Sequence, residues 1–576
     1  MKKVLAVMAG VAFAIAVLVF ALTDKHEDSF LLRTSGFNGF AVNIPMRDGK
    51  HLAADLYLPK REGPFPVIVV QTPYGKTPMF RPLFQFVPPS ALLFGDWGKS
   101  IFSGAKYAVL VVDWRGAGES REAAVAENQR IDPSAADGYD VIQWATAQQW
   151  SNGRAGTWGP SALGLIQYFT ARAQPPNLAC AVPLVHPSQL PHEFFFPGGA
   201  MYNSLVNYLS KLGSDATQGG DLNWSLRDEL TSNYVLTEEA RRRQRAIQTA
   251  ASELHVPFMI IEGWYDIYVD EAFAFFADIQ RHGGSASARE RSRLVVGPWT
   301  HATHAEATGD LSFPNARGDD LRFASRYLDF CLNGEADRFD LGKPAIAYYQ
   351  MGTNEWRYTD HWPPSEAAQR IWYVHGDGSL SRTPPQAENA YSEYRFDPAD
   401  PVPTLGGHVL DPELGMGPRD QSPLIDSRAD VLAFTSDALA NDVVVAGPVT
   451  VTASVSTDRL DTDFHATLTD VHPDGRSMLV TEGIQRLRFR DTPMREDLVE
   501  PGGRYLIEVK LTSTATTFRA GHRIQLLLSS SSYPKYDPNP NTGGPLYTGE
   551  AGVVATNRIH HDREGSTRVS LPTMPH

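Results

Sequence analysis

The chain has 576 residues, of which 42% are hydrophobic, and it carries 52 Lys and Arg against 66 Asp and Glu. The net charge of −14, with no concentrated basic block in the sequence, argues against nucleic acid as a partner. The length exceeds what one hydrophobic core normally serves, so a single small domain is excluded. The hydrophobic content equally excludes a disordered chain.

The N-terminus is typical of a targeting segment. Lys2 and Lys3 precede an uncharged apolar run over residues 4–22, and polar residues follow it. This pattern predicts a signal peptide or a membrane anchor over residues 1–23, and the small residues at 19 and 21 slightly favour cleavage. In either case we expect the rest of the chain outside the cytoplasm, as a periplasmic, secreted or membrane-anchored protein.

Residues 34–188 and 255–365 alternate between short β-rich runs and helical patterns, which is typical of a parallel α/β sheet buried on both faces. We predict that these two segments form one catalytic α/β domain. Strands are predicted over 65–75, 107–116, 154–159, 178–186, 256–266 and 293–301, and helices over 136–149, over 161–173 and up to about Asn333.

Two other regions break this alternation. Residues 189–254 are rich in Phe, Tyr, Asn and Arg and show helical patterns with no strand between them, which predicts an inserted helical cap. Residues 366–576 contain short alternating segments separated by Gly, Pro and Asp turns, which predicts a separate C-terminal β-sandwich domain.

Ser161 lies in the stretch AGTWGPSALGL, between a predicted strand and a predicted helix. A serine on such a turn is typical of a nucleophile elbow, in which the hydroxyl is exposed and the next backbone N–H, here that of Ala162, points at a developing oxyanion. Gly159 and Gly164 would allow the strand and the helix to approach closely. The alternative is that Ser161 caps the helix.

Asp266 and His301 each come directly after a predicted strand, in the order Ser, Asp, His that α/β-hydrolases use. The carboxyl ends of parallel strands share one edge of a sheet, so the three residues are predicted to form a catalytic triad. Singly, Asp266 could be a turn residue and His301 a surface residue. Tyr74 also follows a predicted strand and is a candidate second oxyanion donor beside Ala162, although packing is the more common role of such a tyrosine.

We expect neither a metal nor an organic cofactor. His301, His304 and Glu306 lie close together in the sequence, but a loop with this spacing lacks the further ligands that a closed metal site needs. The chain has two cysteines, Cys180 and Cys331, which could form a disulfide or remain as thiols. Because Cys180 lies in an apolar run, buried thiols are favoured.

The motifs GTWGPSALG, GWYD, GPWTH and TPYGK resemble those of the cocaine esterase and X-Pro dipeptidyl-peptidase family, which includes α-amino acid ester hydrolases and glutaryl-cephalosporin acylases. Further similar segments extend this resemblance over nearly all of the chain after about residue 35. The resemblance implies an α/β-hydrolase domain, a helical cap and a galactose-binding-like jelly-roll. It also implies Ser161 as nucleophile, His301 as general base, Asp266 as its orienting acid, and Tyr74 with the Ala162 N–H as the oxyanion hole.

Some residues depart from the family pattern. Ala162 stands where an aromatic residue is usual, and Asp266 is followed by Ile267 and Tyr268 where aminoester hydrolases carry carboxylates. Asp270 and Glu271 come only later, which argues against an amino-acid acyl group. An aromatic acyl pocket is a candidate role for four residues, although core packing explains most such residues equally well. They are Trp158, Trp264, Phe194 and Phe195.

The sequence therefore predicts a serine hydrolase that cleaves a small-molecule carboxylic ester, or less favourably an amide, through an acyl-enzyme on Ser161. One alternative is an X-Pro dipeptidyl-peptidase, which needs a cap carboxylate such as Glu193, Asp221 or Asp228 to hold the free amine. The other is a carbohydrate-binding protein of the cell envelope with an inactive hydrolase domain. The membrane is a partner only if the N-terminal segment is retained, and assembly into a homo-oligomer stays open.

Overall fold

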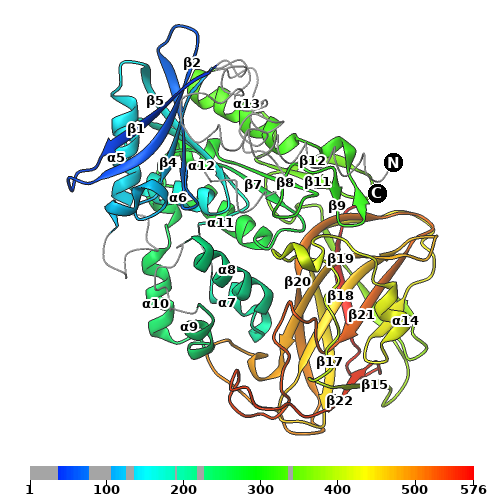
Figure 1. Cartoon of the computed structure of the whole chain (residues 1–576). Coiled ribbons are helices and arrows are strands. Elements are labelled where there is room, and N and C mark those ends of the chain that lie inside the picture. The colour runs from blue at the N-terminus through cyan, green and yellow to red at the C-terminus, as the bar shows by residue number, and fades with distance from the viewer. Residues whose placement is uncertain are drawn as a thin grey trace, which may run out of the picture. The chain divides into compact units, whose positions relative to one another are not determined.

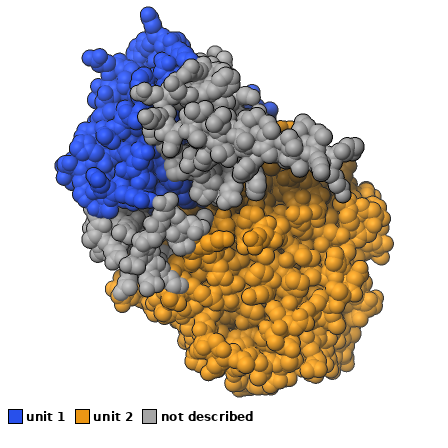
Figure 2. Space-filling model, in the orientation of Figure 1, with its two compact units in different colours: residues 1–183, 321–339 blue, residues 184–320, 340–576 orange. Residues whose placement is uncertain are grey.

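The computed structural model describes residues 37–76, 106–124, 135–188, 191–216, 226–334 and 342–575 (Figure 1). The predicted targeting segment, 1–23, lies outside these residues. Within the described ranges, no helix combines the length and the apolar character needed to cross a membrane. The chain divides into two compact units (Figure 2): unit 1 comprises Met1–Pro183 and Leu321–Phe339, and unit 2 comprises Leu184–Asp320 and Asp340–His576.

Unit 1 is an α/β unit with strand order β1-β2-β4-β3-β5-β6. β3 pairs in parallel with both β4 and β5, whereas β2 is antiparallel to β1 and to β4. Every residue of β3 and β4 is buried, as expected for strands covered on both faces. The strands are β1 (Phe37–Pro45), β2 (His51–Pro59), β3 (Phe65–Thr72), β4 (Ala108–Asp113), β5 (Ser151–Pro160) and β6 (Leu178–Leu184).

The helices of unit 1 are η1 (Gly118–Ala123), α5 (Ala135–Thr146), α6 (Ala162–Arg172) and most of α13 (Asp319–Asn333). The predicted strands from β3 to β6 and the predicted helices are confirmed. β1 and β2 were not predicted, because β1 is an edge strand whose residues are mostly exposed and so gives no clear apolar alternation.

Cys180 in β6 and Cys331 in α13 form a disulfide, so the expectation of buried thiols was wrong. The two residues are 151 positions apart, and their Cα atoms lie 6.2 Å apart. α13 packs against the sheet, since a Cβ on Gly156 of β5 would lie 3.3 Å from Leu328 and from Leu332. Residue types alone do not show that a helix so distant in the sequence returns to β6.

The first part of unit 2 contains the helices between β6 and β7, and the described residues there form no strand, as predicted. Leu184, the last residue of β6, pairs in parallel with Ile261 of β7. The helices are α7 (His192–Phe195), η3 (Pro197–Gly199), α8 (Asn203–Ala216), α9 (Leu226–Ser232), α10 (Glu238–Ile247) and η4 (Ala251–Glu253).

The predicted strands β7 (Met259–Gly263) and β8 (Arg293–Gly297) are confirmed and are parallel to each other. β8 also pairs in parallel with β11 (Ile346–Gln350), and β12 (Glu355–Thr359) is antiparallel to β11. The remaining elements before the sandwich are α11 (Val269–His282), α12 (Ala286–Arg291), β9 (Ala307–Thr308), β10 (Leu311–Ser312) and η5 (Pro314–Ala316).

The C-terminal part of unit 2 is a β-sandwich, drawn from yellow to red in Figure 1. Among the described residues, the larger sheet has order β14-β13-β23-β17-β22-β15 with β20 paired to β17, and the smaller sheet has order β16-β21-β18-β19. Buried aliphatic and aromatic side chains from both sheets form one core between them, as the alternating sequence pattern predicts.

The larger sheet comprises β13 (Ala368–Val374), β14 (Leu380–Ser381), β15 (Tyr391–Phe396), β17 (Val443–Thr457), β20 (Tyr505–Phe518), β22 (Ala555–His560) and β23 (Arg568–Thr573). The smaller sheet comprises β16 (Leu432–Thr435), β18 (Asp463–Val471), β19 (Ser477–Arg486) and β21 (Arg523–Ser529). The short helices of this region are η7 (Pro412–Leu414), α14 (Ser422–Ser427) and η8 (Leu487–Phe489).

Candidate active site

Ser161 lies at a sharp turn between β5, which ends at Pro160, and α6, which begins at Ala162. Its φ of 55° and ψ of −124° are rarely adopted by a non-glycine residue, and such strain is concentrated at functional sites. Its carbonyl accepts hydrogen bonds from the first turn of α6, whereas its hydroxyl makes no capping hydrogen bond to that described turn. Helix capping is therefore not the role of this side chain.

Gly159 makes the turn sterically feasible. Its φ is 154°, and a Cβ at this position would lie 2.5 Å from the Cβ of Leu163, which is far inside van der Waals contact. The buried amide of Gln167 holds the same turn, because its Nε2 donates to the carbonyls of Gly159 (3.2 Å) and Leu163 (2.9 Å) and its Oε1 accepts from the Val182 N–H (3.0 Å). Sequence reasoning missed Gln167, a polar residue on the buried side of an apolar helix.

Tyr74 is half-buried in the loop after β3, and its backbone N–H donates to the Thr72 hydroxyl at 3.1 Å. Two residues later, the ammonium of Lys76 contacts Asp55 at 2.8 Å and Glu119 at 3.0 Å. The backbone N–H of Lys76 donates to Asp113, whose pKa is raised to about 6 by burial. These contacts fix the loop that carries the Tyr74 phenol within unit 1.

Arg115 and Asp113 were predicted to fix the loop after β4 through charge-assisted hydrogen bonds, and the contacts confirm it. The Arg115 guanidinium binds both carboxylate oxygens of Asp137 at 2.6 and 2.8 Å and also contacts Asp48 at 2.7 Å. Asp113 Oδ2 accepts from the Glu119 N–H at 2.7 Å. Bidentate pairing of this kind holds a loop in one orientation.

Asp266 and His301 form a hydrogen-bonded pair in unit 2. Asp266 follows β7 and is fully buried, and His301 follows β8 with its side chain 16% exposed. The Nδ1 of His301 lies 2.9 Å from Asp266 Oδ1, which also accepts the Ile267 N–H at 2.7 Å. An ionised Asp266 holds the proton of His301 on Nδ1 and so leaves Nε2 with a lone pair that can accept a proton.

Glu262 in β7 shapes the charge around this pair. It is fully buried, and burial, followed by the negative charge of Asp266, raises its pKa well above the ordinary value. A neutral Glu262 leaves one negative charge, that of Asp266, to stabilise an imidazolium on His301. Sequence reasoning missed Glu262, although a carboxyl inside the apolar run MIIEG was a signal that could have found it.

His186, just after β6, is a second buried group that sequence reasoning missed. Burial is the main cause that lowers its pKa to about 4, and the charge of His301 contributes to the lowering. Its ring centroid lies 4.8 Å from that of Tyr268, and the Tyr268 ring lies 6.0 Å from that of His301. A neutral imidazole and a phenol thus flank the acid–base pair without adding a positive charge.

The aromatic residues predicted to line a pocket occupy different surroundings. Phe194 stacks on Tyr268 at 5.0 Å and meets Phe195 edge-on at 5.0 Å, so both belong to the apolar cluster beside His301. Trp264 packs against Phe273 and Trp362, and its indole N–H donates to the Tyr349 carbonyl at 2.7 Å. Trp158 is buried in β5.

The predicted site residues fall into both units. Unit 1 carries Tyr74, Trp158, Ser161 and Ala162, and unit 2 carries Phe194, Phe195, Trp264, Asp266 and His301. The structure brings Asp266 and His301 together, and the approach of Ser161 to His301 stays a prediction. Of the cap carboxylates considered for an amine, Glu193 lies on α7 and Asp228 on α9, and Asp221 lies outside the described residues.

Comparison with known proteins agrees with this arrangement. Residues 48–303 match the X-Pro dipeptidyl-peptidase (S15 family), and residues 339–570 match the X-Pro dipeptidyl-peptidase C-terminal non-catalytic domain. Cocaine esterase of Rhodococcus sp. (strain MB1 Bresler) is 32% identical over 583 residues, which cover 92% of this chain and 97% of that protein. The chain belongs to the cocaine esterase and X-Pro dipeptidyl-peptidase family of hydrolases. The resemblance seen in the sequence motifs is thereby confirmed.

Solved structures support the fold of this family member. An α-amino acid ester hydrolase and an aminopeptidase from the marine sediment archaeon Thaumarchaeota archaeon each match with a TM-score of 0.81 at 24% identity, covering 96% of this chain and 98% of theirs. A CocE/NonD family hydrolase from Staphylococcus aureus matches with a TM-score of 0.67 at 18% identity, covering 94% of both chains. The predicted fold class, an α/β-hydrolase with inserted helices and a C-terminal β-sandwich, is confirmed.

Proposed function

We propose that this hydrolase cleaves carboxylic esters through an acyl-enzyme on Ser161, with His301 as the general base and Asp266 as the acid that orients it. The observation that carries the proposal is the 2.9 Å hydrogen bond between His301 and the fully buried Asp266, each placed just after a parallel strand. The strained turn at Ser161, with a hydroxyl that does not cap α6, supports the assignment of the nucleophile. The cocaine esterase relative supports an ester as substrate.

The reaction begins when Nε2 of His301 takes the proton of Ser161 and Oγ attacks the ester carbonyl carbon. The resulting oxyanion accepts hydrogen bonds from the Tyr74 hydroxyl and the Ala162 N–H, where the N-terminus of α6 adds about half a positive charge. Collapse of the tetrahedral intermediate breaks the ester C–O bond, and His301 donates its proton to the leaving alcohol. Water then attacks the acyl-enzyme with His301 again as base, which releases the acid and restores Ser161.

The surroundings of His301 favour an uncharged acyl group. Phe194, Phe195 and Tyr268 present apolar surface beside it, and Trp158 and Trp264 remain candidates for further pocket walls. Burial, with the charge of Asp270 as the next cause, raises the pKa of the nearby Glu271 to about 8. A carboxyl that is protonated at neutral pH offers no fixed charge to a substrate ammonium.

A second candidate, removal of X-Pro dipeptides, rests on Glu193. Its charge is among the causes that raise the pKa of Glu271, so the two carboxyl groups lie near enough to hold one amine between them. Comparing an X-Pro anilide that has a free amine with an uncharged aryl ester separates the two activities. A Glu193→Gln change that impairs only the anilide would favour the peptidase, and a strong preference for the ester would favour the esterase.

The nucleophile is tested by labelling the purified protein with a fluorophosphonate probe. We expect labelling of the wild type, its loss in Ser161→Ala, and a decrease in ester turnover of roughly 10³ to 10⁶. Ser325→Ala, a serine on α13 whose hydroxyl donates to the Arg322 carbonyl, is the matched control and should keep both signals. An unlabelled and inactive wild type would instead favour the carbohydrate-binding alternative.

We further propose that the chain is exported. The disulfide between Cys180 and Cys331 supports this location, since disulfides persist in oxidising compartments and are rare in the cytosol. The apolar run over residues 4–22 after two lysines supports it independently. Cell fractionation followed by N-terminal sequencing would test both export and cleavage, and recovery of the intact chain from the cytosol would contradict the proposal.

A further inference from the structure

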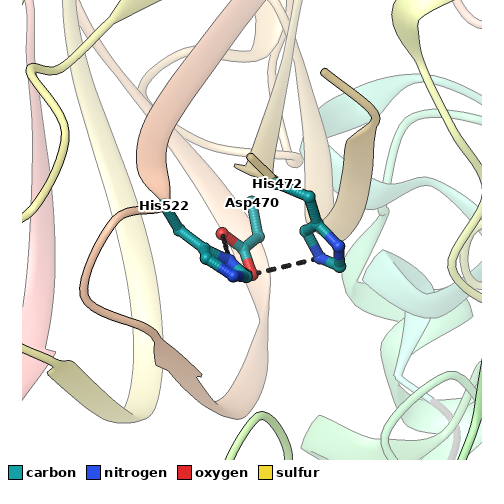
Figure 3. A group of neighbouring side chains, drawn as sticks. All are labelled: Asp470, His472 and His522. Carbon is teal, nitrogen blue, oxygen red and sulfur yellow. Dashed lines mark hydrogen bonds and ion pairs between the residues drawn. The ribbon is translucent and has the colours of Figure 1, made fainter. Parts of the chain in front are cut away.

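Three side chains from two neighbouring loops converge at one end of the smaller sandwich sheet (Figure 3). Asp470 is in the last turn of β18, His472 begins the loop from β18 to β19, and His522 immediately precedes β21. β18 and β21 are paired up to Val471 and Arg523, so these loops leave the sheet side by side. A register shift between Leu468 and Thr469 precedes this point, and such bulges re-aim the side chains that follow.

The backbone holds both histidines in place before any ligand is considered. The His472 N–H donates to the Arg476 carbonyl at 2.9 Å across the loop. The His522 N–H donates to the Arg519 carbonyl at 3.0 Å, and the His522 carbonyl accepts the Leu439 N–H at 2.8 Å. The two imidazoles are therefore carried by loops with defined hydrogen bonds.

The potential ligand atoms form a compact group. His522 Nδ1 lies 2.9 and 3.0 Å from the two oxygens of Asp470, and His472 Nε2 lies 3.5 Å from Asp470 Oδ2. One nitrogen from each ring and one carboxylate oxygen all lie within 4.8 Å of one another. The three side chains are only 13% to 19% exposed, and their polar atoms point inward toward each other (Figure 3).

A hydrogen bond explains the position of His522 but not that of His472. At 3.5 Å, His472 Nε2 is beyond the usual N–H···O distance, yet it faces the same carboxylate. The ring centroids of the two histidines are 4.6 Å apart, so protonating both would bring two positive charges close together. A divalent ion between the three groups would satisfy both imidazole lone pairs and the carboxylate at once.

We propose that Asp470, His472 and His522 bind a zinc-type divalent transition metal. Two imidazole nitrogens and one carboxylate oxygen suit zinc and its neighbours, whereas calcium and magnesium prefer oxygen ligands alone. Ligand distances of about 2.0–2.2 Å require only small side-chain rotations from the present separations. The nearby Arg476 does not oppose a cation strongly, since its guanidinium is paired with Asp474 at 2.9 Å.

The site has a structural role in this proposal, since it ties the β18–β19 loop to the start of β21. Three protein ligands leave one position of a tetrahedron for water. The ion is therefore predicted to stabilise this end of the sandwich. Ester hydrolysis by the proposed mechanism does not need it, and the test below is independent of that function.

The test uses the full chain, purified without a polyhistidine tag, stripped with a chelator and titrated with Co²⁺. We expect visible d–d absorption bands that saturate at one ion per chain and disappear when Zn²⁺ is added in competition. His472→Ala and His522→Ala should each weaken Co²⁺ binding roughly tenfold or more. Metal should raise the melting temperature of the wild type and leave that of the double variant unchanged.

His282→Ala is the matched control, because His282 contacts Asp278 at 2.7 Å on the surface of α11 and has no third ligand at hand among the described residues. It should bind Co²⁺ as the wild type does. His472→Gln and ester turnover without metal verify that the variants are folded. Absence of saturable bands in the wild type, unchanged binding in the His472 and His522 variants, or an equal loss in His282→Ala would each overturn the proposal.

Discussion

The turn at Ser161 in unit 1 and the Asp266–His301 pair in unit 2 are held in place by different physical means. At Ser161 the backbone does most of the work: a positive φ, a glycine where a Cβ would clash, and a buried glutamine amide bridging three elements. At Asp266 the backbone turn is ordinary, and buried ionisable neighbours define the chemistry. One part of the proposed site thus depends on steric fit and the other on charge.

This difference decides how each part should respond to substitution. Damage to a steric turn changes where atoms lie, so it affects geometry and the rate at every pH. Damage to a buried charge pair leaves the shape nearly intact but changes the tautomer and the proton affinity of the imidazole. Isosteric substitutions in unit 2 and loss of constraints in unit 1 therefore separate the two contributions.

Asp266→Asn is expected to have the largest effect of the substitutions that preserve shape. The amide can donate to His301 Nδ1 and so favour the tautomer with the proton on Nε2, which cannot accept the serine proton. We expect turnover to fall roughly 10⁴-fold with little change in fold, as measured by steady-state ester hydrolysis and circular dichroism.

Asp320→Asn is the matched control for that substitution. Asp320 is also fully buried and contacts a histidine, His304, at 3.4 Å. It should lose stability of the same kind without the loss in turnover. If Asp266→Asn keeps more than a tenth of wild-type activity, charge is not what defines the unit 2 part of the site.

The disulfide tests the constraint in unit 1. Replacing Cys180 and Cys331 by serine removes a cross-link that closes a 151-residue loop and holds α13 on β6. Chain entropy predicts a loss of about 5 kcal/mol in the free energy of unfolding. Urea unfolding of the double variant, and of the wild type with and without reductant, measures it.

Turnover per folded molecule separates the two effects of that change. We expect it to remain near wild type at low temperature, because the cross-link stabilises the scaffold and does not touch Ser161. A double variant as stable as the oxidised wild type would show that the loop is already constrained by packing alone.

The success of sequence reasoning followed the same division between the two parts. The turn at Ser161 could be predicted because Gly, Ser and Ala in fixed order specify a backbone shape locally. Asp266 and His301 could be predicted because each follows an apolar strand. Gln167, Glu262 and His186 could not be assigned, since their roles arise from which neighbours the folded chain places around them. The same holds for the disulfide, which needs the return of α13 to β6.

Tyr74→Phe removes one proposed oxyanion donor and leaves the ring in place. We expect turnover to fall roughly 10² to 10³-fold with little change in KM, because the phenol acts on the charge that develops in the transition state. Tyr57→Phe provides a control in the same unit, at a buried tyrosine of β2. An unchanged kcat in Tyr74→Phe would leave the Ala162 N–H as the main donor and remove Tyr74 from the site.

Glu271→Gln has the smallest expected effect and tests the buried charge in unit 2 through stability. The pKa of Glu271 is raised from 4.5 to about 8, mainly by burial, so the folded protein keeps this proton after the unfolded chain has released it. Between pH 4.5 and about 8, folding therefore takes up a proton, and this group lowers stability by about 1.4 kcal/mol per pH unit. Glutamine cannot ionise, so the variant should match the wild type near pH 4.5 and exceed its stability increasingly toward pH 8.

Urea unfolding at several pH values measures that difference, and Glu290→Gln on the exposed surface of α12 provides the control. The control should follow the wild type at every pH. If Glu271→Gln also runs parallel to the wild type, the folded protein accommodates an ionised Glu271. A fixed negative charge would then be available beside Asp266, which would strengthen the case for an amine-bearing substrate and weaken the contrast between a steric and an electrostatic part of the site.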